Sequence, residues 1–269
     1  MRIGVVATGR RLSRDIVAPV TALAAEIDSG IELRFHEQCF ASRGHFAGSD
    51  AERAAAFLEY ANDPSLDAVW FGRGGAGTYR IVAAVMAGLG PAAHQKIWLG
   101  YSDAGFLLAA LYRAGIGRPV HGPMPGDLVS KGPESVMRAL RWFARRDEDA
   151  LEPSLAGSLP AAAFNMVVLS HLLGTPLEPD LAGHVLMLEE TCEPLYRIDR
   201  TMFHIASSAS VRGVAGIRLG SCIPVEANDV DFGETEEAIV RHWCAVNAIP
   251  FLGSAAIGHT KDNRIVPFG

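Results

Sequence analysis

Apolar and polar positions along the first half of the chain alternate between two spacings. Short, mostly apolar runs rich in β-favouring residues are separated by longer stretches whose apolar residues recur at helical spacing. The runs predict strands at Ile3–Ala7, Ile31–Phe35, Ala68–Phe71 and Ile97–Leu99, with a fifth strand opening at Pro119–Val120. The stretches predict helices at Arg14–Ile27, Asp50–Tyr60, Tyr79–Ala87, Asp103–Ala114 and Glu134–Phe143. This succession of strand and helix indicates right-handed crossovers and a mostly parallel sheet.

The character of the chain changes over residues 144–160. This segment is first charged and then rich in Pro, Gly and Ser, which is typical of a linker. It divides a domain of residues 1–143 from a second domain of residues 161–269. In the second domain the pattern predicts helices near Met166–Leu173, Arg197–Ala209 and Thr235–Ala245, and strands at His184–Leu188, Val214–Leu219 and Pro250–Leu252.

Composition narrows the class of protein. Hydrophobic residues make up 49% of the 269 residues and charged residues 20%, as in a folded globular chain. The net charge of −6 argues against a nucleic-acid partner, because phosphate binding needs clustered Lys and Arg. The apolar run at the N-terminus is too short for a signal peptide. Prolines and polar residues interrupt the longest charge-free stretch, which argues against a membrane span. The four cysteines form no CxxC pair, which is typical of isolated thiols in a reducing compartment. We therefore expect a soluble cytoplasmic protein without a membrane span.

One candidate nucleophile follows the fourth predicted strand. Ser102 lies in Gly100-Tyr101-Ser102-Asp103, where an apolar strand turns sharply into a helix. A serine at such a turn is exposed above the edge of the sheet, and the N–H groups of the new helix can stabilise an oxyanion beside its Oγ. Serine is also a common N-cap, so position alone leaves a purely structural role for Ser102 open.

A glycine-rich loop, residues 72–77, follows the third predicted strand. Its glycines allow backbone N–H groups to approach a phosphate or a developing oxyanion. Gly72, Gly74 and Gly77 also satisfy the dinucleotide-binding spacing G-x-G-x-x-G. That fingerprint needs an acidic residue about 20 positions on, and the chain has no Asp or Glu between Asp67 and Asp103. A nucleotide-binding loop is therefore a weaker interpretation, and it stays open.

Two further sites carry groups that could assist a serine. Glu189 and Glu190 end a predicted strand, and His259 lies in a glycine-bearing turn after the last clear strand. A serine, a carboxylate and a histidine, each just after a strand, are the groups that nucleophilic acyl transfer requires. The spacing of His, Cys and acidic residues indicates no metal site, and we expect neither a metal nor another cofactor.

Several ordered motifs resemble the LD-carboxypeptidase family, which includes microcin-immunity peptidases. Gly100-Tyr101-Ser102-Asp103 is similar to the family's nucleophile motif, and Arg73-Gly74-Gly75-Ala76-Gly77 resembles its "RGGYG" loop, with Ala76 in place of the tyrosine. Further matches are His45–Asp50 with Arg53, Arg80, His121–Met124, Leu172–Pro176 with Glu178–Leu181, Leu188–Glu190 with Tyr196–Arg200, and Gly258-His259 with Asn263 and Pro267. Other departures are Ala7–Gly9 for the family's "APS" and Ala163–Asn165 for its "GGN".

The resemblance implies a fold, an activity and a set of site residues. The fold is a flavodoxin-like N-terminal α/β domain with a smaller β-rich, swivelling-barrel-like C-terminal domain, usually in a homodimer. The activity releases a terminal D-amino acid (D-Ala) from an L,D-peptide bond of cytoplasmic murein tetrapeptide in peptidoglycan recycling, without a cofactor. The implied triad is Ser102, His259 and Glu189, the implied oxyanion hole is the N–H groups of Gly75 and Asp103, and the implied substrate-binding residues are Arg73, Gly74 and Tyr101.

Three interpretations remain at this point. The first is an LD-carboxypeptidase acting on a murein peptide. The second is a microcin-immunity-like peptidase or amidase with the same triad and a different acyl donor, such as a peptide-nucleotide. The third is a nucleotide-binding protein that uses the loop of residues 72–77.

Overall fold

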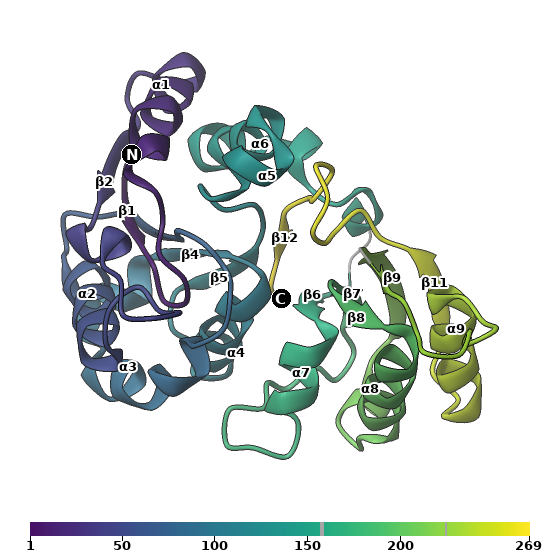
Figure 1. Ribbon diagram of the computed structural model, residues 1–269. Coiled ribbons are helices and arrows are strands. Elements are labelled where there is room, and N and C mark those ends of the chain that lie inside the picture. Colours follow the sequence, from purple (N-terminus) through teal and green to yellow (C-terminus); the bar gives the residue numbers. More distant parts are fainter. Residues whose placement is uncertain (157–158, 224) are drawn as a thin grey trace.

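A computed structural model of the chain describes residues 1–156, 159–223 and 225–269. It has two α/β parts, each built on its own sheet, with the N-terminal part on the left and the C-terminal part on the right of Figure 1. The predicted α/β fold, with a larger parallel N-terminal sheet and a separate smaller unit, is confirmed. The exact division of the chain at residues 143 and 161 stays a prediction.

The N-terminal sheet has the strand order of flavodoxin-like folds. Five of its strands are parallel and run β2-β1-β3-β4-β5, and a short sixth strand, β12, pairs antiparallel with β5. The order reverses between β1 and β3, and ligands of such sheets bind beyond the carboxyl ends of the strands. The strands are β1 Arg2–Val6, β2 Glu32–Phe35, β3 Ala68–Phe71, β4 Ile97–Gly100, β5 Arg118–His121 and β12 Val266–Pro267.

Helices cover both faces of this sheet (Figure 1). Because β3 and β4 are buried on both faces, they are apolar throughout. Trp70 and Leu99 pack with α1 and α6 on one face, whereas Phe71 and Trp98 pack with α2, α3 and α4 on the other. The helices are α1 Val17–Ile27, α2 Asp50–Asn62, α3 Val82–Gly88, α4 Gly105–Arg113, the short α5 Asp127–Lys131, and α6 Pro133–Arg145.

The C-terminal sheet has four parallel strands in the order β11-β9-β7-β6, and three helices are packed against one another beside it (Figure 1). A separate pair of short strands, β8 and β10, lies nearby. The strands are β6 Ala161–Asn165, β7 Val185–Glu190, β8 Glu193–Pro194, β9 Gly216–Cys222, β10 Val225–Glu226 and β11 Phe251–Ser254. The helices are α7 Met166–Leu172, α8 Leu195–Ser207 and α9 Glu236–Val246.

The two parts share an apolar core and a strand. Leu107 of α4 and Leu169 of α7 belong to one continuous buried cluster, and β12 crosses back from the C-terminal part to pair with β5. In the predicted linker, Ala150 and Glu152 are buried, and Glu152 N–H donates to Ile265 O. Gly157 and Ser158 of that linker lie outside the described residues. This packing brings the carboxyl ends of β4 and β7 to the junction of the two parts.

Candidate active site

Ser102 occupies a strained turn between β4 and α4. Its φ is +60°, in the left-handed region that residues other than glycine rarely adopt. Ser102–Ala104 form a single 3-10 turn that continues into α4. Two glycines make room for this turn: a Cβ on Gly100 would lie 2.8 Å from the Phe71 side chain, and one on Gly74 would lie 2.9 Å from Ser102 Oγ. Strain and close packing therefore present the hydroxyl beside the glycine loop.

His259 and Glu189 reach Ser102 from the C-terminal part. His259 Nε2 lies 3.2 Å from Ser102 Oγ, and His259 Nδ1 lies 2.7 Å from Glu189 Oε2. Glu189 is completely buried at the end of β7, whereas the imidazole remains partly exposed. A Cβ on Gly258, whose φ is +118°, would lie 3.1 Å from Glu189 Cβ. The structure thus brings together the three residues of the predicted triad, across both parts of the molecule.

The environment of His259 favours its charged form. Burial alone would lower the pKa of the imidazole, but the charge of Glu189 and its hydrogen bond outweigh burial and raise the pKa above the ordinary value. A histidine held in this way can accept a proton from a serine hydroxyl and is stabilised once protonated. The arrangement can therefore support nucleophilic attack by Ser102.

Glu190 faces away from His259. Its carboxylate accepts hydrogen bonds from Asn165 Nδ2 at 2.7 Å, from Val167 N at 3.0 Å and from Thr191 N at 2.8 Å. Burial raises the pKa of Glu190 to about 7, and these hydrogen bonds offset only part of that effect. Neighbouring side chains alternate across a strand, which is why only Glu189 contacts the imidazole.

Gly75 and Asp103, the residues of the predicted oxyanion hole, lie beside Ser102. The N–H of Asp103 belongs to the first turn of a helix, where no intrahelical acceptor exists, and Gly75 has a φ of +104° that a side chain would strain. Both residues line the same cavity as Ser102. The Asp103 carboxylate accepts a 2.7 Å hydrogen bond from Thr78 N and so ties the glycine loop to the nucleophile turn.

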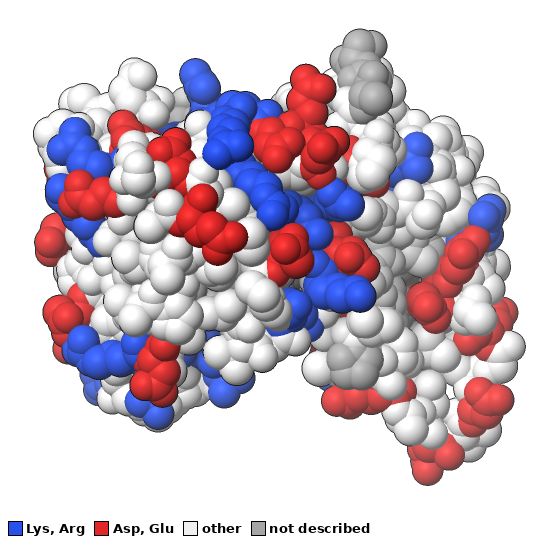
Figure 2. Space-filling view, turned by 90° about the horizontal axis from the view of Figure 1, so that it is seen from above, with Lys and Arg blue, Asp and Glu red and all other residues white. Residues whose placement is uncertain are grey.

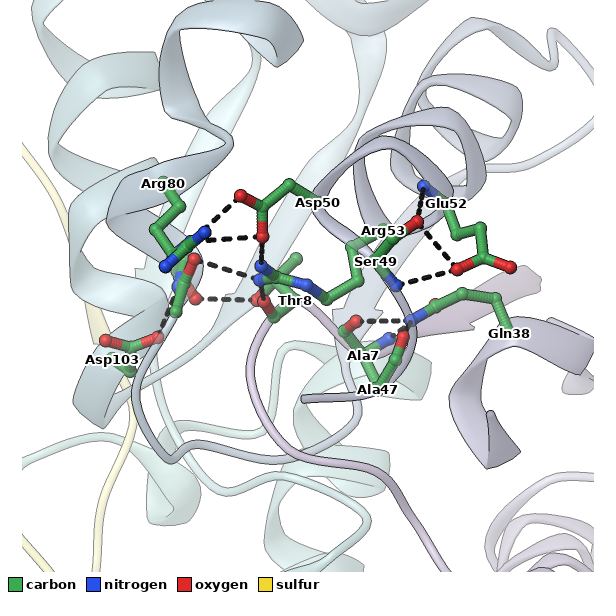
Figure 3. A network of polar contacts seen from close by, with 12 residues as sticks. Ala7, Thr8, Gln38, Ala47, Ser49, Asp50, Glu52, Arg53, Arg80 and Asp103 are labelled. Carbon is green, nitrogen blue, oxygen red and sulfur yellow. Dashed lines mark hydrogen bonds and ion pairs between the residues drawn. The ribbon is translucent and has the colours of Figure 1, made fainter. Parts of the chain in front are cut away.

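A buried arginine holds the other side of the glycine loop (Figure 3). Arg53 is completely buried and donates to the carbonyl oxygens of Thr8 and Gly77, the latter at 2.9 Å. Asp50 pairs with both Arg53 and Arg80. Arg53 and Arg80 are both part of the sequence motifs. Their role in the structure is to fix the backbone of the loop after β3.

Tyr101 packs behind the imidazole. Its ring centroid lies 4.9 Å from that of His259, and its hydroxyl donates to Asp127 Oδ1 at 2.8 Å. Asp127 Oδ2 accepts a hydrogen bond from Met124 N. The residue is 2% exposed, and it lines the smaller of the two cavities at Ser102 while it supports His259 from behind.

A second buried pair supports the His259 loop. Asn263 Oδ1 accepts from Gly258 N at 3.0 Å and lies 3.0 Å from His121 Nε2. Burial lowers the pKa of His121 to about 4, despite the nearby charge of Glu189. A neutral His121 therefore donates to Asn263, which fixes the turn that carries His259.

Two cavities meet at Ser102. The smaller, about 180 Å³, is lined by Ser102, His259 and three cations, Arg10, Arg73 and Lys131. Gly74 lines this cavity as well, so the predicted binding residues Arg73 and Gly74 lie beside the nucleophile. Burial and the nearby Arg10 lower the pKa of Arg73. Figure 2 shows that Lys and Arg side chains gather on one face in a band running toward the junction of the two parts.

Sequence reasoning missed several residues of this site. Arg10 and Lys131 carry no motif signal, and their place beside Ser102 follows only from the fold. Asp127 had one usable signal, because it follows the His121–Met124 motif closely in a segment rich in Gly and Pro. Asn165 is the last residue of β6, a strand that the pattern did not predict. Among the residues described, no group of His, Cys, Asp and Glu could hold a metal ion, and no helix is long and apolar enough to span a membrane.

Comparison with known proteins places the chain in a family. The family model described as the LD-carboxypeptidase N-terminal domain matches residues 3–122, and the model of the C-terminal domain matches residues 161–269. A putative carboxypeptidase of Synechocystis sp. is 31% identical over 248 residues, which cover 89% of this chain and 80% of the relative. A murein tetrapeptide carboxypeptidase of Pseudomonas aeruginosa is 26% identical over 280 residues, covering 94% of this chain and 90% of the relative.

Solved structures share the fold over the whole chain. A muramoyltetrapeptide carboxypeptidase from Oxalobacter formigenes superimposes with a TM-score of 0.82 at 23% identity, covering 100% of this chain and 93% of that one. A microcin C7 self-immunity protein in complex with aspartyl sulfamoyl adenosine gives a TM-score of 0.79 at 16% identity, covering 100% and 91%. Taken with the family models, these matches show that the chain belongs to the LD-carboxypeptidase family of peptidases.

Proposed function

We propose that this protein is a serine carboxypeptidase that releases D-Ala from murein tetrapeptide by hydrolysing an L,D-peptide bond. The observation that carries the proposal is the chain of contacts from Ser102 Oγ through His259 to the buried Glu189. The name of the Pseudomonas aeruginosa relative supports the murein substrate. Action in the cytoplasm during peptidoglycan recycling, and a homodimeric assembly, belong to the same proposal.

Each step of the reaction has a residue to perform it. Ser102 Oγ attacks the carbonyl carbon while His259 Nε2 takes the hydroxyl proton, and the N–H groups of Gly75 and Asp103 stabilise the oxyanion. His259 then gives the proton to the leaving amine nitrogen as the C–N bond breaks. Water attacks the acyl-serine with His259 again as base, and the released carboxyl product restores the Ser102 hydroxyl.

The cations of the smaller cavity determine the orientation in which the substrate binds. The leaving amine must reach His259, and His259 lines the cavity that also holds Arg10, Arg73 and Lys131. A released amino acid carries a free carboxylate, which these cations would bind. The leaving residue therefore occupies the cationic cavity, as a carboxypeptidase requires.

The decisive experiment is mass spectrometry of products after incubation with murein tri-, tetra- and pentapeptides. We expect the tetrapeptide to lose D-Ala and the tripeptide to remain unchanged. The pentapeptide ends in a D,D-bond and should also remain unchanged. An intact tetrapeptide in the presence of folded protein would refute the murein substrate.

One observation favours a second candidate, a microcin-immunity-like amidase on a peptide-nucleotide or related acyl substrate. Arg10 and Arg73 are shared with a further cavity of about 440 Å³ that Arg11 and His45 also line, and such a cavity could hold an anionic leaving group larger than an amino acid. Release of sulfamoyl adenosine and the free amino acid from an aminoacyl sulfamoyl adenosine, together with an intact murein tetrapeptide, would select this candidate.

A further inference from the structure

The cavity of about 440 Å³ lies apart from the nucleophile. Ser102 lines the smaller cationic cavity and a larger, mostly apolar cavity of about 1060 Å³, but it is not among the described residues that line this one. Segments that follow β1, β2 and β3 form its walls. The strand order of the N-terminal sheet reverses between β1 and β3, and open α/β sheets bind ligands beyond the strand ends at such a point. We therefore call it the switch-point cavity.

Hydrogen bonds hold these segments in place. Arg10 N donates to Gly74 O at 3.2 Å, which ties the segment after β1 to the loop after β3. The side-chain amide of Gln38 donates to Ala7 O at 2.8 Å and also to Ala47 O, which ties the segments after β1 and β2 (Figure 3). The walls are therefore formed before a ligand arrives, and binding does not require the ordering of a loop.

The switch-point cavity carries uncompensated positive charge. The guanidinium groups of Arg10, Arg11 and Arg73 line it, and its described lining contains no Asp or Glu. None of the three forms an ion pair within the part of the chain that the structure describes. Burial and the neighbouring charge of Arg10 lower the pKa of Arg73. Such a group of guanidinium donors fits an anion with several oxygens, above all a phosphate.

The other walls indicate what carries the phosphate. Ser13 and Ser42 offer hydroxyl groups, and Leu12 is the one apolar side chain in the described lining. No Phe, Tyr or Trp side chain lines the described part of the cavity, so a nucleotide base has no aromatic ring on which to stack. A volume of about 440 Å³ is that of a small-molecule site, and it exceeds the needs of a single ion. These properties fit a phosphate attached to a small, hydroxyl-rich carrier.

Two of the cations also serve the catalytic side. Arg10 and Arg73 line the smaller cavity together with Ser102 and His259, whereas Arg11 lines the switch-point cavity alone. In the proposed function the smaller cavity receives the carboxylate of the leaving residue. A phosphate beside Arg10 and Arg73 therefore competes with that carboxylate for the same donors.

We propose that the switch-point cavity binds a sugar phosphate, and that the bound phosphate inhibits peptide cleavage by engaging Arg10 and Arg73. The phosphate lies among the three arginines, and the sugar hydroxyls face Ser13 and Ser42. Binding follows from the walls of the cavity and is independent of the serine mechanism. The inhibition rests on the proposed function.

Isothermal titration calorimetry with ribose 5-phosphate and ribose tests the binding. We expect ribose 5-phosphate to bind with a dissociation constant below about 1 mM, and ribose to release no measurable heat, because the arginines recognise the phosphate. Equal affinity for the two sugars, or binding of neither, would overturn the assignment.

A matched pair of variants locates the site. Arg11 and Arg14 are both exposed, but Arg11 lines the cavity without an ion pair in the described ranges, whereas Arg14 pairs with Glu37. Arg11→Gln and Arg14→Gln change the net charge equally. We expect Arg11→Gln to weaken binding of ribose 5-phosphate at least about tenfold, and Arg14→Gln to weaken it less than about twofold. Equal losses in the two variants would contradict this location.

Kinetics with murein tetrapeptide test the inhibition. Saturating ribose 5-phosphate should raise KM at least about fivefold and leave kcat unchanged, and Arg11→Gln should need at least about tenfold more of it for the same effect. An unchanged KM would overturn the proposed competition. If the wild type cleaves no tetrapeptide, the serine carboxypeptidase proposal fails, and the calorimetry still decides whether the sugar phosphate site exists.

Discussion

His259 Nδ1 lies 2.7 Å from Oε2 of Glu189, whereas the adjacent Glu190 directs its carboxylate to Asn165 and the start of α7. The two glutamates are neighbours in sequence, both buried, and bonded to different partners. Their environments predict different consequences of the same substitution.

Glu189→Gln should lower kcat by roughly 10² to 10⁴, because the amide keeps the shape of the side chain but removes the charge that stabilises imidazolium. Glu190→Gln should cost far less, since its carboxylate does not touch His259. Steady-state kinetics of both variants with one substrate decide the matter. A larger kcat loss in Glu190→Gln than in Glu189→Gln would show that Glu190, and not Glu189, supports His259.

The pH dependence of kcat/KM should follow His259. The imidazole must be neutral to accept the Ser102 proton, and Glu189 raises its pKa despite burial. Activity should therefore rise with pH through a value above the ordinary histidine pKa of about 6.5. In Glu189→Gln the rising limb should move to lower pH, because the residual effect of burial lowers the pKa. A rising limb that stays at the same pH in this variant would show that Glu189 does not influence the group whose titration controls activity.

Glu190 should make stability depend on pH. Burial raises its pKa in the folded protein to about 7, from 4.5. Between these values the folded state holds a proton that the unfolded state has released, so the free energy of unfolding falls as pH rises through this window. Glu190→Gln should remove roughly 1 to 3 kcal/mol of that fall. Urea unfolding of wild type and Glu190→Gln at pH 5 and pH 8 measures the change in the free energy of unfolding between these pH values. An equal change in the two proteins would rule out this role of Glu190.

The fold was predictable from sequence where local pattern and tertiary environment agree. The buried parallel strands β1, β3 and β4 read as apolar runs because both faces are covered. By contrast, β6 begins with three alanines, which have low strand propensity, and forms because β7 offers a parallel partner. The strand β12 has only two residues and depends on β5, which is distant in sequence.

The candidate site was predictable to a similar degree. Ser102 and His259 each follow a strand, Glu189 lies at the end of one, and all three carry motif signals; the structure brings them together. The cations Arg10 and Lys131 and the apolar cavity have no counterpart in local sequence, because segments far apart in the chain form them. Arg10 and Lys131 come together within the N-terminal part, whereas the larger cavity is lined by residues of both parts.

Gly74→Ala tests the close packing at the nucleophile. The added Cβ would lie 2.9 Å from Ser102 Oγ and would displace the hydroxyl. A displacement of about 1 Å should lower kcat by roughly 10². Gly213→Ala is the control, because the nearest atom to its added Cβ is 3.8 Å away. Equal activity of Gly74→Ala and wild type would show that the hydroxyl has more freedom than this packing implies.

Chelators should leave activity unchanged, because the triad needs no metal and no group of metal-ligating side chains occurs within the described ranges. Rates before and after dialysis against EDTA check this expectation. Loss of activity that zinc restores would contradict the serine mechanism.

Replacement of the nucleophile tests the serine mechanism most directly. Turnover of murein tetrapeptide should be measured for wild type, Ser102→Ala, His259→Ala and the double variant, with circular dichroism to verify folding. We expect each single variant to lose at least about 10³-fold in kcat, and the double variant to lose no more than the worse single one, because triad residues act as a unit. A folded Ser102→Ala protein with near wild-type turnover would contradict the mechanism.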